Sequence, residues 1–182
     1  MNELFRRFFR LFGCIVCVSA LVFSPILLAS NKPVIVVVGD SLSAGYGIDP
    51  REGWVELLQQ RLDNTVQPYQ VVNASISGDT TTGGQARLGK LLDTHNPTIV
   101  VLELGGNDGL RGQPLRIMRS NLESMIVDSK NAGAKVLLLG MQIPPNYGAR
   151  YTQTFADTFT DLAKKHRIAL VPFFLDQVAL KA

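Results

Sequence analysis

The chain alternates between short, nearly continuous apolar runs and longer segments in which apolar residues recur every three or four positions. The runs at 34–38 and 98–104 are almost free of polar residues, which is typical of strands buried on both faces of a parallel sheet. Shorter runs at 69–73, 135–139 and 168–171 predict three further strands.

Helical periodicity fills the intervals between these runs. The first helix is expected over 53–63, with Trp54, Leu57, Leu58 and Leu62 on its inward face. Further helices are expected over 85–94, from Pro114 to about 133, from about 151 to 166, and over 173–180. Strands and helices that alternate in this way predict an α/β fold, a flavodoxin-like, three-layer, doubly wound sheet of five parallel strands.

Three predicted strands are followed by unusual residues. Ser41 comes directly after the first strand, Gly78 lies in a polar stretch after the second, and Asn107 follows two glycines after the third. The carboxyl ends of parallel strands share one edge of the sheet, and ligands of open α/β sheets bind there. These three residues are therefore expected to converge on one cleft.

Ser41 is a candidate nucleophile because Gly39 allows a sharp turn between strand and helix, as in serine hydrolases. The turn lacks the Gly-x-Ser-x-Gly spacing, and the alternative is an ordinary strand-to-helix turn capped by Asp40 and Ser41. Asp40 is expected to hold this turn together rather than to serve as a catalytic acid. Glu103 stands in an apolar strand, needs buried donors, and receives no functional role.

An acyl-transfer reaction at Ser41 requires hydrogen-bond donors for the oxyanion. The backbone N–H groups of Ser41 and Gly78 and the side-chain amide of Asn107 are candidates. The simpler alternatives are that Gly78 only serves a turn and that residues 107–109 form an ordinary turn.

The segments Gly39-Asp40-Ser41-Leu42, Gly78 and Gly105-Gly106-Asn107-Asp108 are similar to three of the four sequence blocks of the SGNH (GDSL) hydrolases. Within that family, residues 73–80, 103–112 and 146–148 most resemble bacterial periplasmic enzymes that hydrolyse acyl-CoA thioesters, lysophospholipids and aryl esters. The resemblance covers roughly residues 34–182 and implies the SGNH hydrolase fold.

The resemblance implies that Ser41 forms an acyl-enzyme, with the Ser41 and Gly78 N–H groups and Asn107 as the oxyanion hole. It also implies a shallow apolar groove for a single acyl chain, and neither a cofactor nor a metal ion. The residues expected to contact substrate are Asp108, Gly109, Leu110, Ile143, Pro144 and Tyr147.

One block of the family is missing. The family carries an Asp-x-x-His near its carboxyl terminus, which supplies the base and its orienting acid. The two histidines of this chain are His95 and His166, and neither has an aspartate three residues before it. We therefore expect a hydrolase domain that lacks its C-terminal end and has little activity in this form. The alternatives are a carbohydrate acetylesterase and a degenerate domain that binds a ligand without catalysis.

The first 30 residues have the pattern of a signal peptide. Arg6, Arg7 and Arg10 precede an apolar run over 11–28 that contains both cysteines and ends in small residues. The alternative is an uncleaved membrane anchor. The remaining residues, 31–182, are expected to form one hydrolase domain that is periplasmic or secreted, without stable membrane insertion once the leader is cleaved.

The net charge of +3 arises largely in this leader. Without its three arginines and one glutamate, 15 basic and 14 acidic residues remain. No basic stripe with interleaved aromatic residues is present, so nucleic-acid binding is not expected. The expected partner is a small acyl ester or thioester, and the protein is expected to be a monomer.

Overall fold

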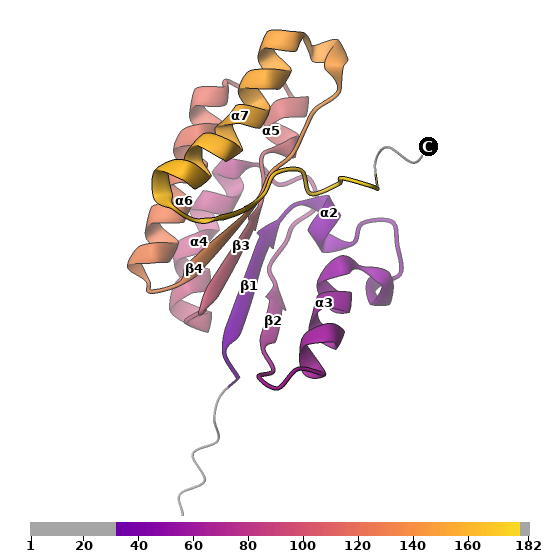
Figure 1. The fold of residues 1–182 in the computed structure, drawn as a ribbon, viewed down its shortest axis with the longest axis vertical. Coiled ribbons are helices and arrows are strands. Elements are labelled where there is room, and N and C mark those ends of the chain that lie inside the picture. The colour runs from indigo at the N-terminus through magenta and orange to yellow at the C-terminus, as the bar shows by residue number, and fades with distance from the viewer. Residues whose placement is uncertain (1–31, 179–182) are drawn as a thin grey trace, which may run out of the picture. The chain divides into compact units, whose positions relative to one another are not determined.

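The core of the fold is a sheet of five parallel strands. The computed structural model describes residues 32–178, so the predicted leader over 1–30 lies outside the described residues. The sheet has the order β2-β1-β3-β4-β5, which confirms the predicted doubly wound arrangement (Figure 1). Its strands are β1 (Val34–Gly39), β2 (Gln70–Asn73), β3 (Ile99–Glu103), β4 (Lys135–Leu139) and β5 (Ala169–Val171).

The continuous apolar run of β1 is explained by burial on both of its faces. Val36 and Val38 belong to the larger core cluster, whereas Ile35 and Val37 belong to a second cluster on the other face. Successive side chains of a strand point to opposite faces of the sheet, so a central strand covered on both sides requires apolar residues at every position.

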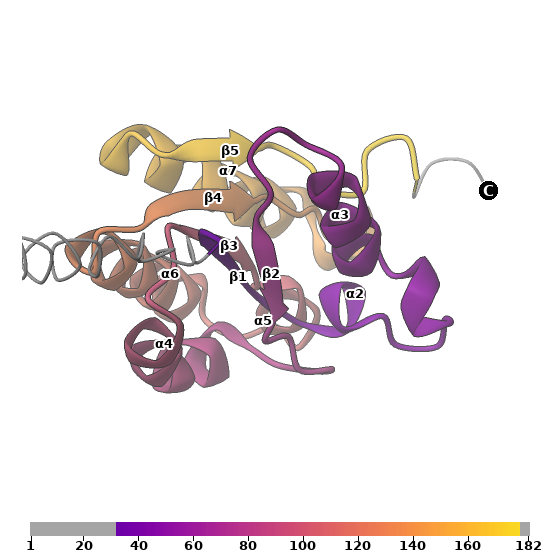
Figure 2. The same ribbon diagram turned by 90° about the horizontal axis from the view of Figure 1, so that it is seen from below.

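The helices cover the two faces unequally, and Figures 1 and 2 show α3 on the opposite side of the sheet from α4 and α6. The larger cluster packs under α4, α6 and α7, and the smaller one under α3. Among residues 32–178, none of the helices combines the length and the apolar character needed to cross a bilayer. The α-helices are α2 (Ser41–Ala44), α3 (Trp54–Asp63), α4 (Thr81–His95), α5 (Gly106–Leu110), α6 (Leu115–Asn131) and α7 (Ala149–His166), and short 3₁₀ turns occupy Pro50–Glu52 and Pro145–Tyr147.

Two helix predictions require correction. Helix α4 begins at Thr81 rather than at 85, because the carboxylate of Asp108 accepts hydrogen bonds from the Thr81 N–H at 2.9 Å and from its hydroxyl at 2.6 Å. The expected helix over 173–180 is not formed in its described part, where residues 174–178 make turns. Phe174 instead packs edge-to-face on Trp54, with ring centroids 5.3 Å apart.

The inward face of α3 is rotated from the predicted one. Val55 is buried, whereas Leu57 is half exposed. Trp54 and Leu62 pack against the smaller core cluster as expected.

Helix α4 offers a direct test of packing, because Gly84 lies against the core and Gly89 does not. A Cβ atom at Gly84 would lie 2.2 Å from Cδ1 of the buried Leu104, whereas nothing lies within 4 Å of one at Gly89. We expect Gly84→Ala to lower the free energy of unfolding by about 1–3 kcal/mol. Gly89→Ala should raise it by about 0.5–1 kcal/mol through helix propensity. Urea unfolding of both variants measures the difference, and equal stabilities would contradict this packing.

Candidate active site

A cavity of about 320 Å³ lies at the carboxyl edge of the sheet. It brings together the turn after β1, the helix after β3 and the loop after β4, which are far apart in the sequence. Most of its lining is apolar, and Ser41 and Asn107 are among its few polar groups. The lining residues are Asp40, Ser41, Leu42, Gly106, Asn107, Leu110, Met141, Gln142, Ile143, Pro144, Phe173 and Leu175.

Ser41 is positioned by the N-cap of α2. The carboxylate of Asp40 accepts a hydrogen bond from the Leu42 N–H at 3.0 Å, which confirms that Asp40 holds the turn. Side-chain capping of this kind satisfies one of the free N–H groups of the first helical turn. Burial raises the pKa of Asp40 above its usual range. Ser41 itself is half-buried and faces the cavity.

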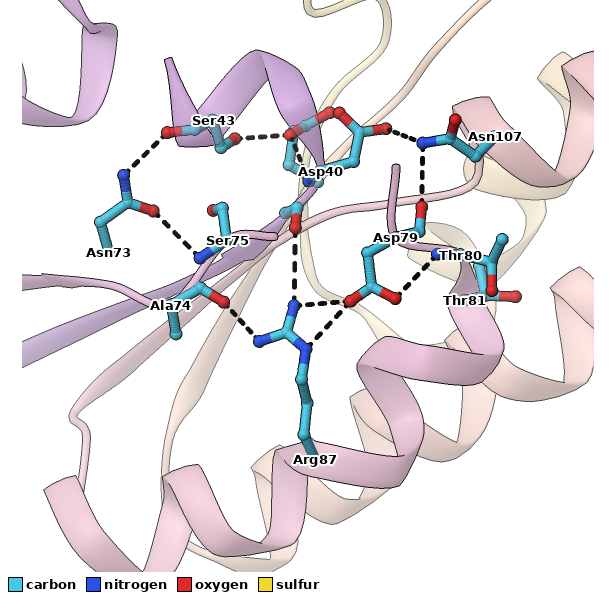
Figure 3. Close-up of polar contacts among 12 residues, drawn as sticks. Asp40, Ser43, Asn73, Ala74, Ser75, Asp79, Thr80, Thr81, Arg87 and Asn107 are labelled. Carbon is cyan, nitrogen blue, oxygen red and sulfur yellow. Dashed lines mark hydrogen bonds and ion pairs between the residues drawn. The ribbon is translucent and has the colours of Figure 1, made fainter. Parts of the chain in front are cut away.

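Asn107 connects two of the strand-end loops (Figure 3). Its Nδ2 donates to Oδ2 of Asp40 at 3.1 Å and to the carbonyl oxygen of Asp79 at 2.9 Å. A side-chain amide has two N–H donors, so both hydrogens of Asn107 point to protein acceptors in this structure. The residue after Gly78 is thereby held directly against the Asn107 amide.

The loop that carries Gly78 is anchored from below by Arg87 of α4 (Figure 3). The Arg87 guanidinium pairs with Oδ2 of Asp79, with Nε at 3.0 Å and Nη2 at 2.9 Å. It also donates to the carbonyl oxygens of Ala74 and Gly39, which lie just beyond β2 and at the end of β1. Gly78 has a φ of +78°, a conformation that side-chain-bearing residues rarely adopt. One arginine therefore fixes two strand ends and this loop.

Three predicted substrate-contact residues line the cavity: Leu110, Ile143 and Pro144. Asp108 and Gly109 are buried and are not among the lining residues, because Asp108 is committed to Thr81 and Gly109 lies against Phe155. Tyr147 lines a neighbouring surface groove, and its hydroxyl donates to the Leu110 carbonyl oxygen at 2.9 Å. Gly78 is connected to the site through its loop rather than as a lining residue.

Both histidines lie away from Ser41. His95 ends α4 and His166 ends α7. Helices of a doubly wound fold run antiparallel to its strands, so their C-terminal ends lie at the sheet edge opposite the cavity. His166 is paired there with Glu123, at 2.8 Å between Nε2 and Oε1. Neither histidine is among the residues that line the cavity with Ser41.

The sequence does not predict the ion pair between Arg87 and Asp79, which is called the clamp below. Arg87 immediately precedes the inward Leu88 on its helix, and Asp79 follows the singled-out Gly78. Neither position alone indicates a pair eight residues apart, because the loop must first fold back over the helix. Within residues 32–178, no cluster of three or more potential ligand residues is arranged to hold a metal ion.

The clamp predicts a large difference between two arginines. Arg87 and Asp79 have side chains only 21% and 12% exposed, whereas those of the Arg119–Asp161 pair are 39% and 53% exposed. Arg87→Met should lower the free energy of unfolding by about 1.5–3 kcal/mol, because it removes the cation paired with the little-exposed Asp79 carboxylate and the side-chain donor to the Ala74 carbonyl oxygen. Arg119→Met should cost less than about 1 kcal/mol. Urea unfolding of both variants provides the measurement, and equal losses would contradict an anchoring role for Arg87.

Comparison with known proteins agrees with this geometry. Residues 37–181 match the model of the GDSL-like Lipase/Acylhydrolase family. The chain is 54% identical over 144 residues to Esterase TesA of Pseudomonas aeruginosa, which covers 79% of this chain and 72% of that protein. It is 42% identical over 153 residues to Thioesterase 1/protease 1/lysophospholipase L1 of Escherichia coli K12, covering 84% and 72% of the two chains. A crystal structure of TesA superposes with a TM-score of 0.79 at 52% identity, over 82% of this chain and 83% of that one. The chain therefore belongs to the GDSL-like lipase/acylhydrolase family, the SGNH hydrolases.

Proposed function

We propose that this protein is a serine hydrolase of acyl esters and thioesters in which Ser41 forms the acyl-enzyme. The observation that carries the proposal is that Ser41 and Asn107, from the ends of β1 and β3, line one largely apolar cavity. An apolar cleft with a few convergent polar groups is the usual form of a small-molecule site.

In the proposed reaction, the Ser41 hydroxyl oxygen attacks the acyl carbon and the carbonyl oxygen becomes an oxyanion. The backbone N–H groups of Ser41 and Gly78 and the amide of Asn107 would stabilise that charge. Because both Asn107 hydrogens already have acceptors, its donation to an oxyanion requires one hydrogen to be shared in a three-centre bond. Asp40 is unsuited as the base, since its two oxygens already accept bonds from Leu42 and Asn107.

The missing base determines how fast this polypeptide can react. Its only histidines are His95 and His166, and both lie at the far edge of the sheet. In subtilisin, loss of the catalytic histidine lowers turnover about 10⁶-fold, about as much as loss of the whole triad. Roughly 10³-fold catalysis over water remains from the oxyanion donors and from binding. We accordingly propose that the 182-residue polypeptide hydrolyses esters slowly.

The proposed substrates carry one acyl chain, as in acyl-CoA, lysophospholipids and aryl esters. Leu110, Ile143, Pro144 and Phe173 give the cavity an apolar wall for such a chain. The names of the relatives, an esterase and a thioesterase that is also a lysophospholipase, support the same substrate class. Asp108, Gly109 and Tyr147 would act indirectly, by holding the loops around that wall.

Two other functions remain to be distinguished from this one. A carbohydrate acetylesterase is disfavoured by the cavity lining, in which Phe173 is the single aromatic residue among residues 32–178. A binding domain without catalysis is favoured by the distance of both histidines from Ser41. Export to the periplasm or beyond and a monomeric state complete the proposal, the first resting on the leader pattern of residues 1–30.

Added imidazole provides the sharpest test of the proposed nucleophile. If Ser41 lacks only its base, hydrolysis of p-nitrophenyl hexanoate should be slow and should rise with imidazole concentration, because imidazole can take the serine proton. Ser41→Ala should show only the rate that imidazole gives without enzyme, and Ser120→Ala, an exposed serine on α6, should behave like the parent. A parent that equals Ser41→Ala at every imidazole concentration would reject Ser41 as nucleophile. Rapid hydrolysis without imidazole would contradict the proposal that this polypeptide lacks a base for Ser41.

Chain-length dependence separates the acyl hydrolase from the acetylesterase. Each methylene buried in the cavity contributes up to about 0.8 kcal/mol, so the imidazole-supported rate should increase from the acetate to the hexanoate ester. The series of p-nitrophenyl acetate, butyrate and hexanoate measures this trend. A preference for acetate would instead favour the acetylesterase.

A further inference from the structure

Glu103 is a buried carboxyl group that the proposed reaction does not use. It ends β3, directly below the turn that carries Ser41, and its side chain is fully buried. Its Oε2 accepts a hydrogen bond from Ser43 Oγ at 2.5 Å and from the Asp40 N–H at 3.2 Å. The two donors flank Ser41 in the sequence, so Glu103 binds both ends of that turn.

The approach of Glu103 depends on the glycine at the end of β1. A Cβ atom at Gly39 would lie 2.6 Å from Glu103 Oε2 and 2.6 Å from Ser43 Oγ. Any side chain there would displace the carboxyl group or the hydroxyl group. The glycine that lets the chain turn toward Ser41 therefore also makes room for this contact.

The charged groups around Glu103 do not neutralise a carboxylate at its position. Asp40 lies closest and is acidic. Behind it, Asp79 is paired with Arg87, and Asp108 is bound to Thr81. Arg87 is the cation bound to these acids, and its donors are already directed to Asp79 and to two carbonyl oxygens.

Protonation of Glu103 removes the need for a neighbouring cation. The second oxygen of Glu103, Oε1, is buried and has no hydrogen-bond partner within residues 32–178. An ionised carboxylate with an unsolvated oxygen is far more costly than a neutral carboxyl group in the same place. Burial, followed by the charge of Asp40, raises the pKa of Glu103 to about 8.

We propose that Glu103 is a positioning residue for the Ser41 turn, holding Asp40 and Ser43 in its protonated form and loosening the turn when it ionises. The role rests on the proposed function only in naming Ser41 as the group that is positioned. At neutral pH, Glu103 keeps its hydrogen bonds to Ser43 and to the Asp40 N–H. In alkaline solution, the ionised carboxylate moves toward water or toward Arg87. Either movement pulls the carboxyl group away from Ser43.

The sign of the pH effect follows from proton binding. Between its ordinary pKa of 4.5 and about 8, Glu103 holds a proton in the folded protein that it has lost in the unfolded chain. Its contribution to stability is therefore full below about pH 4.5 and is lost as the pH rises through 8. One proton of difference changes the unfolding equilibrium constant by about tenfold per pH unit.

Glu103→Gln is the informative variant, because glutamine is a neutral isostere of the protonated acid and keeps an acceptor for Ser43 and Asp40. Between pH 5 and pH 8, the unfolding constant of the parent should rise relative to that of Glu103→Gln by at least threefold per pH unit, measured by urea unfolding. Glu56→Gln is the matched control, since Glu56 is an exposed glutamate on α3, and it should keep the parental slope. A change of less than twofold in the ratio of parent to Glu103→Gln across this range would overturn the proposal.

Hydrogen exchange tests the connection to the turn itself. The Ala44 N–H donates to the Asp40 carbonyl oxygen at 2.9 Å, and the Tyr46 N–H to that of Ser41 at 3.1 Å. After correction for intrinsic exchange, their protection should fall at least threefold between pH 7 and pH 9 in the parent and remain constant in Glu103→Gln. Constant protection in both proteins would overturn the positioning role even if the stability slope is present.

Neither readout requires catalysis, so the proposal and the hydrolase function can fail separately. If Glu103→Gln does not fold, ¹³C-carboxyl NMR of the parent decides the matter. A titration midpoint above pH 6.5 for Glu103 supports the proposal, and a midpoint at or below 6.5 overturns it.

Discussion

The arrangement of the site depends on how buried carboxyl groups at the carboxyl edge of the sheet find donors. Four acidic side chains lie there, and each accepts hydrogen bonds from different donors. Asp79 takes the guanidinium of Arg87, Asp108 takes the N–H and hydroxyl of Thr81, and Asp40 takes the N–H of Leu42 and the amide of Asn107. Glu103 takes Ser43 and the Asp40 N–H, and its raised pKa of about 8 keeps a proton on it at neutral pH. Because each donor belongs to a different strand-end segment from its acceptor or to the turn itself, the same bonds that satisfy these acids also fix the loops. Figure 3 shows those between Asp79 and Arg87 and between Asp40 and Asn107.

Sequence reasoning predicted that Ser41 and Asn107 would lie in one cleft, which the structure confirms, but it did not predict the hydrogen bonds around them. Ser41, Gly78 and Asn107 were identified because parallel strands place their carboxyl ends together, a rule that needs only the order of strands and helices. The hydrogen-bond partners were not identified, since the pairing of Arg87 with Asp79 and of Asp108 with Thr81 depends on how the loops fold back. The position of Glu103 in an apolar strand predicts that it needs buried donors. Periodicity does not indicate that Ser43 is one of these donors.

The differences in the fold have the same origin. The continuous runs of β1 and β3 were unambiguous because both faces of a central strand are buried. Helix α4 starts four residues before the predicted position, since Asp108, 27 residues away in the sequence, binds its first N–H. Val55 rather than Leu57 faces the sheet in α3. A short helix with several apolar residues can be rotated about its axis in more than one way and still bury an apolar face. Residues 174–178 form turns, and Phe174 packs on Trp54, a contact that helical periodicity cannot reveal.

The family fold thus supplies this chain with a turn that carries the proposed nucleophile, with candidate oxyanion donors and with an apolar cavity, whereas neither of its two histidines lines that cavity. The central claim is that Ser41, Gly78 and Asn107 act on one substrate atom. A crystal structure after prolonged incubation with an alkyl fluorophosphonate tests it most directly. We predict phosphorus bonded to Ser41 Oγ, with the phosphoryl oxygen about 3 Å from the Gly78 nitrogen and Asn107 Nδ2. A phosphonate on another residue, or a phosphoryl oxygen turned away from Gly78 and Asn107, would contradict the account.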